Sequence, residues 1–136
     1  MAVVIHMKRS MNAVMGKKKK TLPKKFNELI EAADISTLKE VFVQCELDAR
    51  GGYSKTTALG FYKIPDELVC WLVDQGADIN AKDNYKRTPL HSQSISWCGN
   101  VRLFLELGSD IEALDYRNET PLHAAASAFN HKRYKN

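Results

Sequence analysis

Two histidines stand at the same place in a four-residue motif that the chain uses twice. Residues 88–91 and residues 120–123 both read Thr-Pro-Leu-His. A histidine could ligate a metal ion or serve as a general acid or base. The repetition favours a structural role instead, in which the ring hydrogen-bonds neighbouring backbone and joins adjacent loops, because the repeat position accounts for both rings. The motif residues are Thr88, Pro89, Leu90, His91, Thr120, Pro121, Leu122 and His123.

The three cysteines are the other residues with reactive side chains. Cys45, Cys70 and Cys98 form no C-x-x-C pair and have no histidine at a metal-ligand interval. We therefore interpret them as small buried apolar residues in a reducing compartment. The sequence also contains no constellation of carboxylates, no glycine-rich phosphate loop and no nucleophile elbow. We predict no catalysis, no metal and no cofactor.

Charge is unevenly distributed along the chain. The net charge is +4, but residues 1–25 contain eight basic residues and no acidic one, whereas residues 26–136 contain 12 basic and 16 acidic residues. Only the first segment could act as a surface that attracts phosphate groups. No apolar run approaches the roughly 18 residues that a membrane-spanning helix needs, so we expect no transmembrane segment.

A period of about 32 residues organises the rest of the chain. The second Thr-Pro-Leu-His follows the first by 32 residues, and Gly-Ala-Asp-Ile-Asn-Ala at residues 76–81 returns as Gly-Ser-Asp-Ile-Glu-Ala at residues 108–113 with the same offset. A degenerate earlier copy aligns Tyr53 with Tyr85, and places Gly60 where the later copies have histidine. Two segments that share one period indicate a repeat architecture.

Apolar residues between these landmarks are spaced as in paired short helices. One stretch precedes Cys45, one precedes Gly76 and one precedes Gly108. Pro65 and the two acidic residues after it are typical of a helix start. Gly76 and Gly108 stand where a helix ends and the backbone adopts a left-handed conformation.

This pattern resembles the ankyrin-repeat family. The two Thr-Pro-Leu-His motifs, the two Gly-x-Asp-Ile segments and the three alanines at 124–126 carry the resemblance, which covers roughly residues 26–130. It implies an all-α solenoid of stacked helix-turn-helix units with protruding hairpin-like loops. In the motif, threonine would cap the helix, proline would occupy its first turn and leucine would face the core.

We expect a disordered basic tail at residues 1–25 and an ankyrin-repeat domain at residues 26–136. Its repeats would lie near residues 26–50, 51–82, 83–114 and 115–136. The last repeat has no apolar second helix after Phe129, so it would leave an apolar face uncovered. Either the chain is a fragment of a longer array, which we favour, or something else covers that face.

Departures from the family pattern mark the candidate binding residues. The loop tips are rich in tyrosine and in cations, which are enriched at protein interfaces. Polar and aromatic side chains also replace the alanines that follow the motif in its most complete copy. The candidates for partner binding are Tyr53, Tyr62, Tyr85, Lys86, Arg87, Gln93, Tyr116 and Arg117. The alternative is that these are solvated loop residues.

Three further positions depart from the family. Lys86 and Asn118 stand where the family usually has glycine, so we expect either a strained lysine or an altered turn at Lys86. Trp97 lies in the link between two helices, where it would either fill space in the core, which we favour, or be an exposed anchor.

The basic tail allows several interpretations. Val4, Met7, Met11 and Val14 share one face of a notional helix, and a run of four lysines follows at residues 17–20. The tail could be a disordered leader, a nuclear-import patch, or an amphipathic anchor or targeting segment. A start at a later methionine is a fourth interpretation.

The resemblance implies a non-catalytic module that binds a partner protein through repeat loops and the concave face. As an alternative, the chain would be the targeting or substrate-recruiting domain of a larger enzyme or degradation adaptor that continues beyond residue 136. A weaker alternative is binding of nucleic acid or an anionic membrane through residues 1–25. We expect a monomer without a small-molecule substrate, located in the cytoplasm or nucleus.

Overall fold

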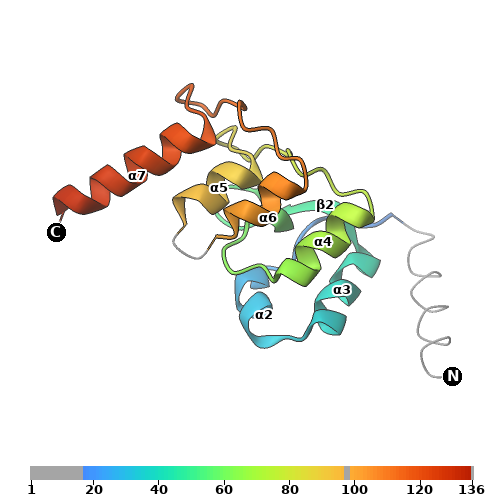
Figure 1. Cartoon of the computed structure of the whole chain (residues 1–136). Coiled ribbons are helices and arrows are strands. Elements are labelled where there is room, and N and C mark those ends of the chain that lie inside the picture. Colours follow the sequence, from blue (N-terminus) through green and yellow to red (C-terminus); the bar gives the residue numbers. More distant parts are fainter. Residues whose placement is uncertain (1–16, 97–98, 136) are drawn as a thin grey trace, which may run out of the picture.

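The computed structural model describes the backbone of residues 17–96 and 99–135, and side chains as far as residue 129. Short helices lie side by side, and the last helix projects from the others (Figure 1). The elements in chain order are β1 Lys19–Thr21, α2 Phe26–Ala32, α3 Ile35–Gln44, β2 Cys45–Gly51, β3 Thr56–Thr57, the 3₁₀ turn η1 Ala58–Gly60, α4 Asp66–Asp74, α5 Pro89–Ile95, α6 Val101–Glu106 and α7 Pro121–Lys135.

The helices follow the predicted repeats, as the pairs α2 and α3, η1 and α4, and α5 and α6, with α7 starting the last unit. The first helix of the second unit is reduced to the single turn η1. Gly60 lies close to Thr56, because a Cβ atom on the glycine would lie 2.0 Å from the Thr56 hydroxyl oxygen. A larger residue at this position would force Thr56 to shift, so the glycine suits the tight turn in this copy of the motif.

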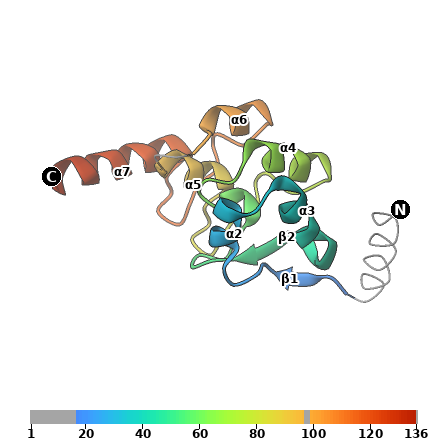
Figure 2. The same ribbon diagram turned by 90° about the horizontal axis from the view of Figure 1, so that it is seen from below.

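The expectation of an all-α fold is corrected by a small three-stranded sheet. Strand β2 pairs in parallel with β1 and antiparallel with β3, in the order β1-β2-β3 (Figure 2). The pair β2 and β3 is the hairpin of the first repeat loop, with Arg50 opposite Thr57.

Strand β1 lies within the segment that we predicted to be a tail. Leu22, just after β1, is buried, and its N–H donates to the carbonyl oxygen of Arg50 at 2.8 Å. A Cβ atom on Gly51 would lie 2.9 Å from the Leu22 Cβ, so the glycine permits this close approach. The folded part therefore includes residues 19–22, ahead of the predicted boundary at residue 26. Residues 1–16 lie outside the described residues.

The hydrophobic core begins under this sheet and continues between the helix pairs. Phe26 packs edge-on against Phe42 and Phe61, with ring centroids 6.2 and 5.1 Å away. Trp71 also contacts Phe42, at 6.1 Å between centroids, and is half-buried at the edge of the core. The aromatic residues of the first two repeats thus form one continuous cluster, as nearest-neighbour packing in a repeat array requires.

Helix ends are formed by local hydrogen bonds. The Asp34 carboxylate accepts from the Thr37 N–H at 2.9 Å at the start of α3. Hydrogen bonds from the side chain and then the backbone of Thr37 lower the pKa of Asp34. Gly76 and Gly108 have φ angles of +109° and +93°, which confirms their predicted role at the ends of α4 and α6. Sequence-local rules therefore account for the limits of these helices.

Acidic and amide side chains connect each repeat to the next. The Asp48 carboxylate accepts from the Asp78 N–H at 3.0 Å, and one repeat later the Asn80 side-chain oxygen accepts from the Asp110 N–H at 2.9 Å. These are exposed bonds at the loops, and each forms only where the neighbouring repeat supplies the acceptor.

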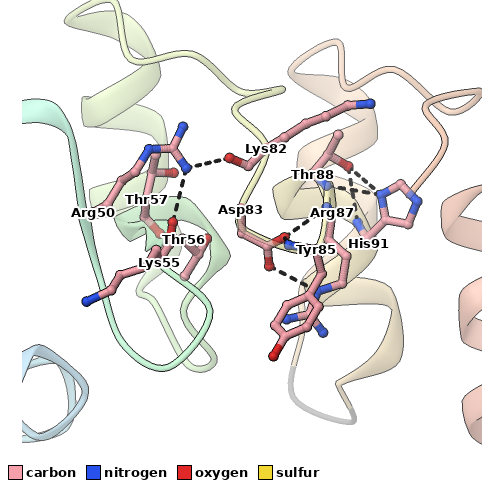
Figure 3. A network of polar contacts seen from close by, with 10 residues as sticks. All are labelled: Arg50, Lys55, Thr56, Thr57, Lys82, Asp83, Tyr85, Arg87, Thr88 and His91. Carbon is pink, nitrogen blue, oxygen red and sulfur yellow. Dashed lines mark hydrogen bonds and ion pairs between the residues drawn. The ribbon is translucent and has the colours of Figure 1, made fainter. Parts of the chain in front are cut away.

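Cations at one repeat position form a second series of connections. Arg50 donates to the carbonyl oxygen of Lys82, and Lys82 donates to that of Leu114 at 3.0 Å (Figure 3). Leu114 occupies the next equivalent position, where an apolar side chain has no donor to continue the series.

The expectation of three buried cysteines is wrong for one of them. Cys45 is buried and its thiol donates to the Thr21 carbonyl oxygen at 3.4 Å, whereas Cys70 is exposed on α4. Burial raises the pKa of the Cys45 thiol. Cys70 is exposed because it lies on the side of α4 that faces away from Leu68, Val69 and the rest of the core. Cys98 lies outside the described residues.

Helix α7 differs from the other first helices of the array. It continues from Pro121 to Lys135 without the turn that separates α5 from α6. The motif leucine Leu122 was predicted to face the core, but 78% of it is exposed. The prediction is wrong because no second helix covers this position among the described residues. No helix in the described part of the chain is long and apolar enough to span a bilayer.

Candidate functional site

Three tyrosines from successive loop tips lie in a row, which we name the tyrosine ladder. The ring centroids of Tyr53 and Tyr85 are 6.2 Å apart and the rings are nearly parallel, while Tyr85 and Tyr116 are 5.6 Å apart and tilted. Backbone bonds hold the loops together. Asn84 N–H donates to the Ser54 carbonyl at 2.9 Å, and Tyr116 N–H donates to the Tyr85 carbonyl at 3.0 Å. The ladder is therefore built on a hydrogen-bonded framework.

The second and third loops each contain a buried aspartate that hydrogen-bonds the turn. Asp83 accepts from the N–H groups of Tyr85 and Arg87 at 2.8 and 2.9 Å, and its other oxygen pairs with the Arg87 guanidinium at 3.0 Å (Figure 3). Asp115 accepts from Arg117 N–H in the same way, at 2.9 Å. Aspartate side chains stabilise such turns by bonding backbone two residues ahead. Sequence reasoning missed both aspartates, although their shared offset of 32 residues was a usable signal.

Arginines lie over the ladder rings. The Arg87 guanidinium carbon is 4.9 Å from the Tyr85 ring centroid, and that of Arg117 is 5.3 Å from the Tyr116 centroid. Arg117 also donates to the Tyr116 hydroxyl at 2.8 Å. These cation–π contacts fix the arginines and tyrosines relative to one another.

The Tyr85 hydroxyl is affected by its neighbours in the ladder. A hydrogen bond with Tyr53 raises the pKa of Tyr85, with smaller contributions from burial and neighbouring tyrosines that Arg87 partly opposes. The Tyr85 phenol therefore stays protonated at neutral pH and can donate or accept hydrogen bonds.

A groove of about 710 Å³ runs beside the tyrosine ladder. All three ladder tyrosines, Arg87 and Tyr62 line it. Lys63 and Glu31 also line it and form an exposed ion pair, with N and O atoms 3.0 Å apart. The groove thus combines aromatic side chains with charged groups of both signs.

A second groove, of about 440 Å³, adjoins the first. Arg87 and Tyr116 line both grooves, and the second is bounded further along by Arg117 and by Ala124 and Ala128 of α7. Together they form one surface that passes over three loop tips and the first helices of four repeats, α2, η1, α5 and α7. We name it the ladder face.

Most of the predicted binding residues lie on the ladder face or at its edge. Tyr53, Tyr62 and Tyr116 are 90%, 56% and 53% exposed, and Arg117 is also exposed, whereas Tyr85 and Arg87 are half-buried. Sequence reasoning placed these residues at loop tips from the repeat offset. It did not show that their rings stack.

Gln93 is a correction, because only 1% of its surface is exposed. Its amide donates to the carbonyl oxygens of Leu59 and Phe61 at 3.0 and 2.9 Å. The single turn η1 leaves these two carbonyls without helical partners, and the glutamine side chain satisfies them. Gln93 is therefore part of the core and is not available to a partner.

Lys86 adopts the left-handed conformation that the family pattern demands. Its φ is +59°, close to the +58° of Lys55 and the +60° of Asn118 at the equivalent positions. The turn is unaltered, and of the two alternatives the strained lysine is the one observed. Lys86 is exposed beside the tyrosine ladder.

The first Thr-Pro-Leu-His motif is fully built into the structure. Thr88 N–H donates to His91 Nδ1 at 3.1 Å, so Nδ1 is unprotonated and Nε2 carries the hydrogen (Figure 3). His91 Nε2 then donates to the Glu119 carbonyl at 2.8 Å, in the next repeat. Thr88 caps α5 and Leu90 is buried, as predicted.

The second motif keeps only its local bonds. Thr120 Oγ1 and His123 Nδ1 are 3.0 Å apart, but both residues lie at the surface. In the described residues, no group of three His, Cys, Asp or Glu side chains is placed to hold a metal ion. Trp97, predicted to be either a core residue or an anchor, lies outside the described residues.

Comparison with known proteins identifies the architecture. Residues 57–134, more than half of the chain, match a family model described as ankyrin repeats in three copies. No curated protein matches the chain in a sequence search. The repeat period, the capped Thr-Pro-Leu-His motifs and this match agree, and the chain belongs to the ankyrin-repeat family.

Proposed function

We propose that this protein binds a partner protein through the ladder face. Ankyrin repeats are generally protein–protein interaction modules. The observation that carries the proposal is the tyrosine ladder, in which three tyrosine rings in mutual contact lie beside two adjoining grooves and two of the rings are more than half exposed. Tyrosine and arginine contribute disproportionately to binding energy where they contact a partner.

The rigidity of the ladder supports this role. Arg87 is already held by Asp83, and each ring contacts a neighbour, so few rotamers are left to freeze on binding. Preorganised side chains lower the entropic cost of association. The surface thus offers large aromatic area together with hydroxyl and guanidinium groups that can orient a partner.

The residues that we propose to contact the partner are Tyr53, Tyr62, Tyr85, Lys86, Arg87, Tyr116 and Arg117. We further propose a monomer in the cytoplasm or nucleus, since unpaired cysteines suit a reducing compartment. The match to interaction repeats favours a binding role over catalysis.

The test is affinity capture followed by mass spectrometry, with the full chain as bait at low and high salt. A double variant, Tyr53→Ala with Tyr116→Ala, removes two exposed ladder rings without opening the core. Ile111→Ala is the matched control, because it removes an exposed apolar side chain outside the grooves.

We expect a partner that is retained at high salt by the wild type and the control and is lost from the double variant. Capture that is equal for the double variant would overturn the proposal. Capture that disappears at high salt would instead indicate binding through the basic N-terminal segment.

A further inference from the structure

Helix α7 carries a second surface, on the side away from the ladder face. Leu122, Ala125, Ala126 and Phe129 recur at helical spacing and line a pocket of about 390 Å³ together with Ile95 from the end of α5. Leu122 is 78% and Phe129 53% exposed. Ala124 and Ser127 of α7 line the ladder-face groove and not this pocket, whereas Ala128 lies between the two and lines both. We name the outward side the α7 flank.

The same flank is covered by a helix in the preceding repeats. Leu59 and Leu90 occupy the position of Leu122, yet they are only 1% and 2% exposed. Helix α6 lies beside α5 (Figure 1) and contributes Phe104, which is 1% exposed, to the same core. A short link joins these helices, so they run in opposite directions. The repeat therefore supplies an internal template for what fits against α7.

We propose that the α7 flank binds an amphipathic helix of a partner protein, seated as α6 is seated against α5. Such a helix would present large apolar side chains at i, i+3 and i+4 toward Leu122 and the two alanines. Alanines form a shallow surface, and close packing against it requires bulky residues on the other side. A second copy of α7 would place alanine against alanine and leave space unfilled.

Charge gives the partner helix a further property. By sequence, residues 130–136 contain three lysines and arginines and no acidic residue. An antiparallel helix would start near this end of α7, so the basic composition of the segment and the dipole of the partner helix would both favour acidic residues in its first turn. Helix α4 of this chain has this form, with Asp66 and Glu67 in the first turn and a buried Leu68 and Leu72 behind them.

The probe for the test is a synthetic peptide with the sequence of residues 64–76 carrying Cys70→Ala. It is titrated into the ¹⁵N-labelled full chain, and amide chemical shifts are followed by NMR. The matched control peptide also carries Leu68→Asp and Leu72→Asp, which keep its length and its acidic first turn. Sedimentation of the chain alone measures self-association.

We expect shifts at the amides of Leu122, Ala125 and Ala126 and at the end of α5, and none with the control peptide. Leu122→Asp should weaken binding about tenfold or more, because a leucine contact is replaced by a buried charge. Since Leu122 is exposed, the variant should keep the wild-type melting temperature.

Three results would overturn the proposal. The first is the absence of shifts at millimolar peptide, and the second is shifts that persist in Leu122→Asp or concentrate on the ladder face. The third is a concentration-dependent dimer that Leu122→Asp abolishes, since the occupant would then be a second copy. None of these results bears on capture through the tyrosine ladder, so the two proposals fail independently.

Discussion

The two Thr-Pro-Leu-His motifs have the same sequence and different surroundings. In both, the threonine hydroxyl lies close to the histidine Nδ1, at 2.9 Å in the first and 3.0 Å in the second. His91 is nevertheless fully buried and bonds the Glu119 carbonyl of the next repeat, whereas His123 is exposed. The local bonds are set by the motif, and the long-range bond is set by the neighbour.

This difference shows how stability is distributed in the array. A repeat is stabilised mainly by the interfaces with its neighbours, so a motif at the end of the described array contributes less than the same motif inside it. The same substitution at equivalent positions of the two motifs separates two contributions to the free energy of unfolding. One comes from the residue within its own repeat, and the other from its interface with the next repeat.

The two motif leucines, Leu90 and Leu122, should show the largest difference in their effect on the free energy of unfolding. We expect Leu90→Ala to lower the free energy of unfolding by about 2–5 kcal/mol, because it leaves a cavity in the core. Leu122→Ala should change it by less than about 0.5 kcal/mol, since the side chain is mostly in water. Urea denaturation monitored by circular dichroism measures both. Equal losses would show that Leu122 is covered in solution.

The histidines should give the next largest difference. His91→Ala leaves the Thr88 N–H and the Glu119 carbonyl without partners, and we expect a loss of about 3 kcal/mol. His123→Ala removes only exposed bonds and should cost less than about 1 kcal/mol. The double variant His91→Ala with Glu119→Ala is the control, because Glu119→Ala keeps the backbone carbonyl that His91 contacts and removes only the Glu119 side chain. Similar losses for both histidines would contradict a neighbour-dependent role.

The sequence predicts those parts of the fold that depend on local rules. Residue types at fixed offsets predicted the repeat period, the starts of the helices and the glycines at the helix ends. The position of Asn118 in its turn predicted its left-handed φ. Strand β1 was not predicted. Its three residues have no apolar alternation, and its partners in β2 lie more than twenty residues away.

The burial of particular residues also needed the structure. Gln93 has the composition of a surface residue, and it is buried only because η1 leaves two carbonyls exposed to it. Leu122 follows the motif of a core residue, and its exposure depends on what lies beside α7. At the candidate site, offsets gave the loop positions of Tyr53, Tyr85 and Tyr116 but not the spacing of their rings. Such contacts depend on how neighbouring repeats are stacked.

Replacing Thr57 or Thr88 by valine should change the stability of the protein in opposite directions. Thr57 is fully buried, and within the described residues its hydroxyl has no hydrogen-bond partner. Thr57→Val removes that unpaired group at nearly constant volume, and we expect a gain of about 1 kcal/mol. Thr88→Val removes a helix cap and should cost about 1 kcal/mol. Thermal denaturation of the pair measures both, and a loss at Thr57 would indicate a buried water on its hydroxyl.

The left-handed turn positions should show the smallest effects. A positive φ destabilises lysine by about 1 kcal/mol, and it destabilises asparagine by less. Lys86→Asn should therefore stabilise the protein by less than about 1 kcal/mol, because it relieves this strain without the added chain entropy of glycine. Asn118→Gly should be nearly neutral, because the strain it relieves is small and offset by that entropy. The measurement is the shift in urea midpoint at constant slope. A loss on Lys86→Asn would mean that the lysine side chain contributes more to the loop than its backbone strain costs.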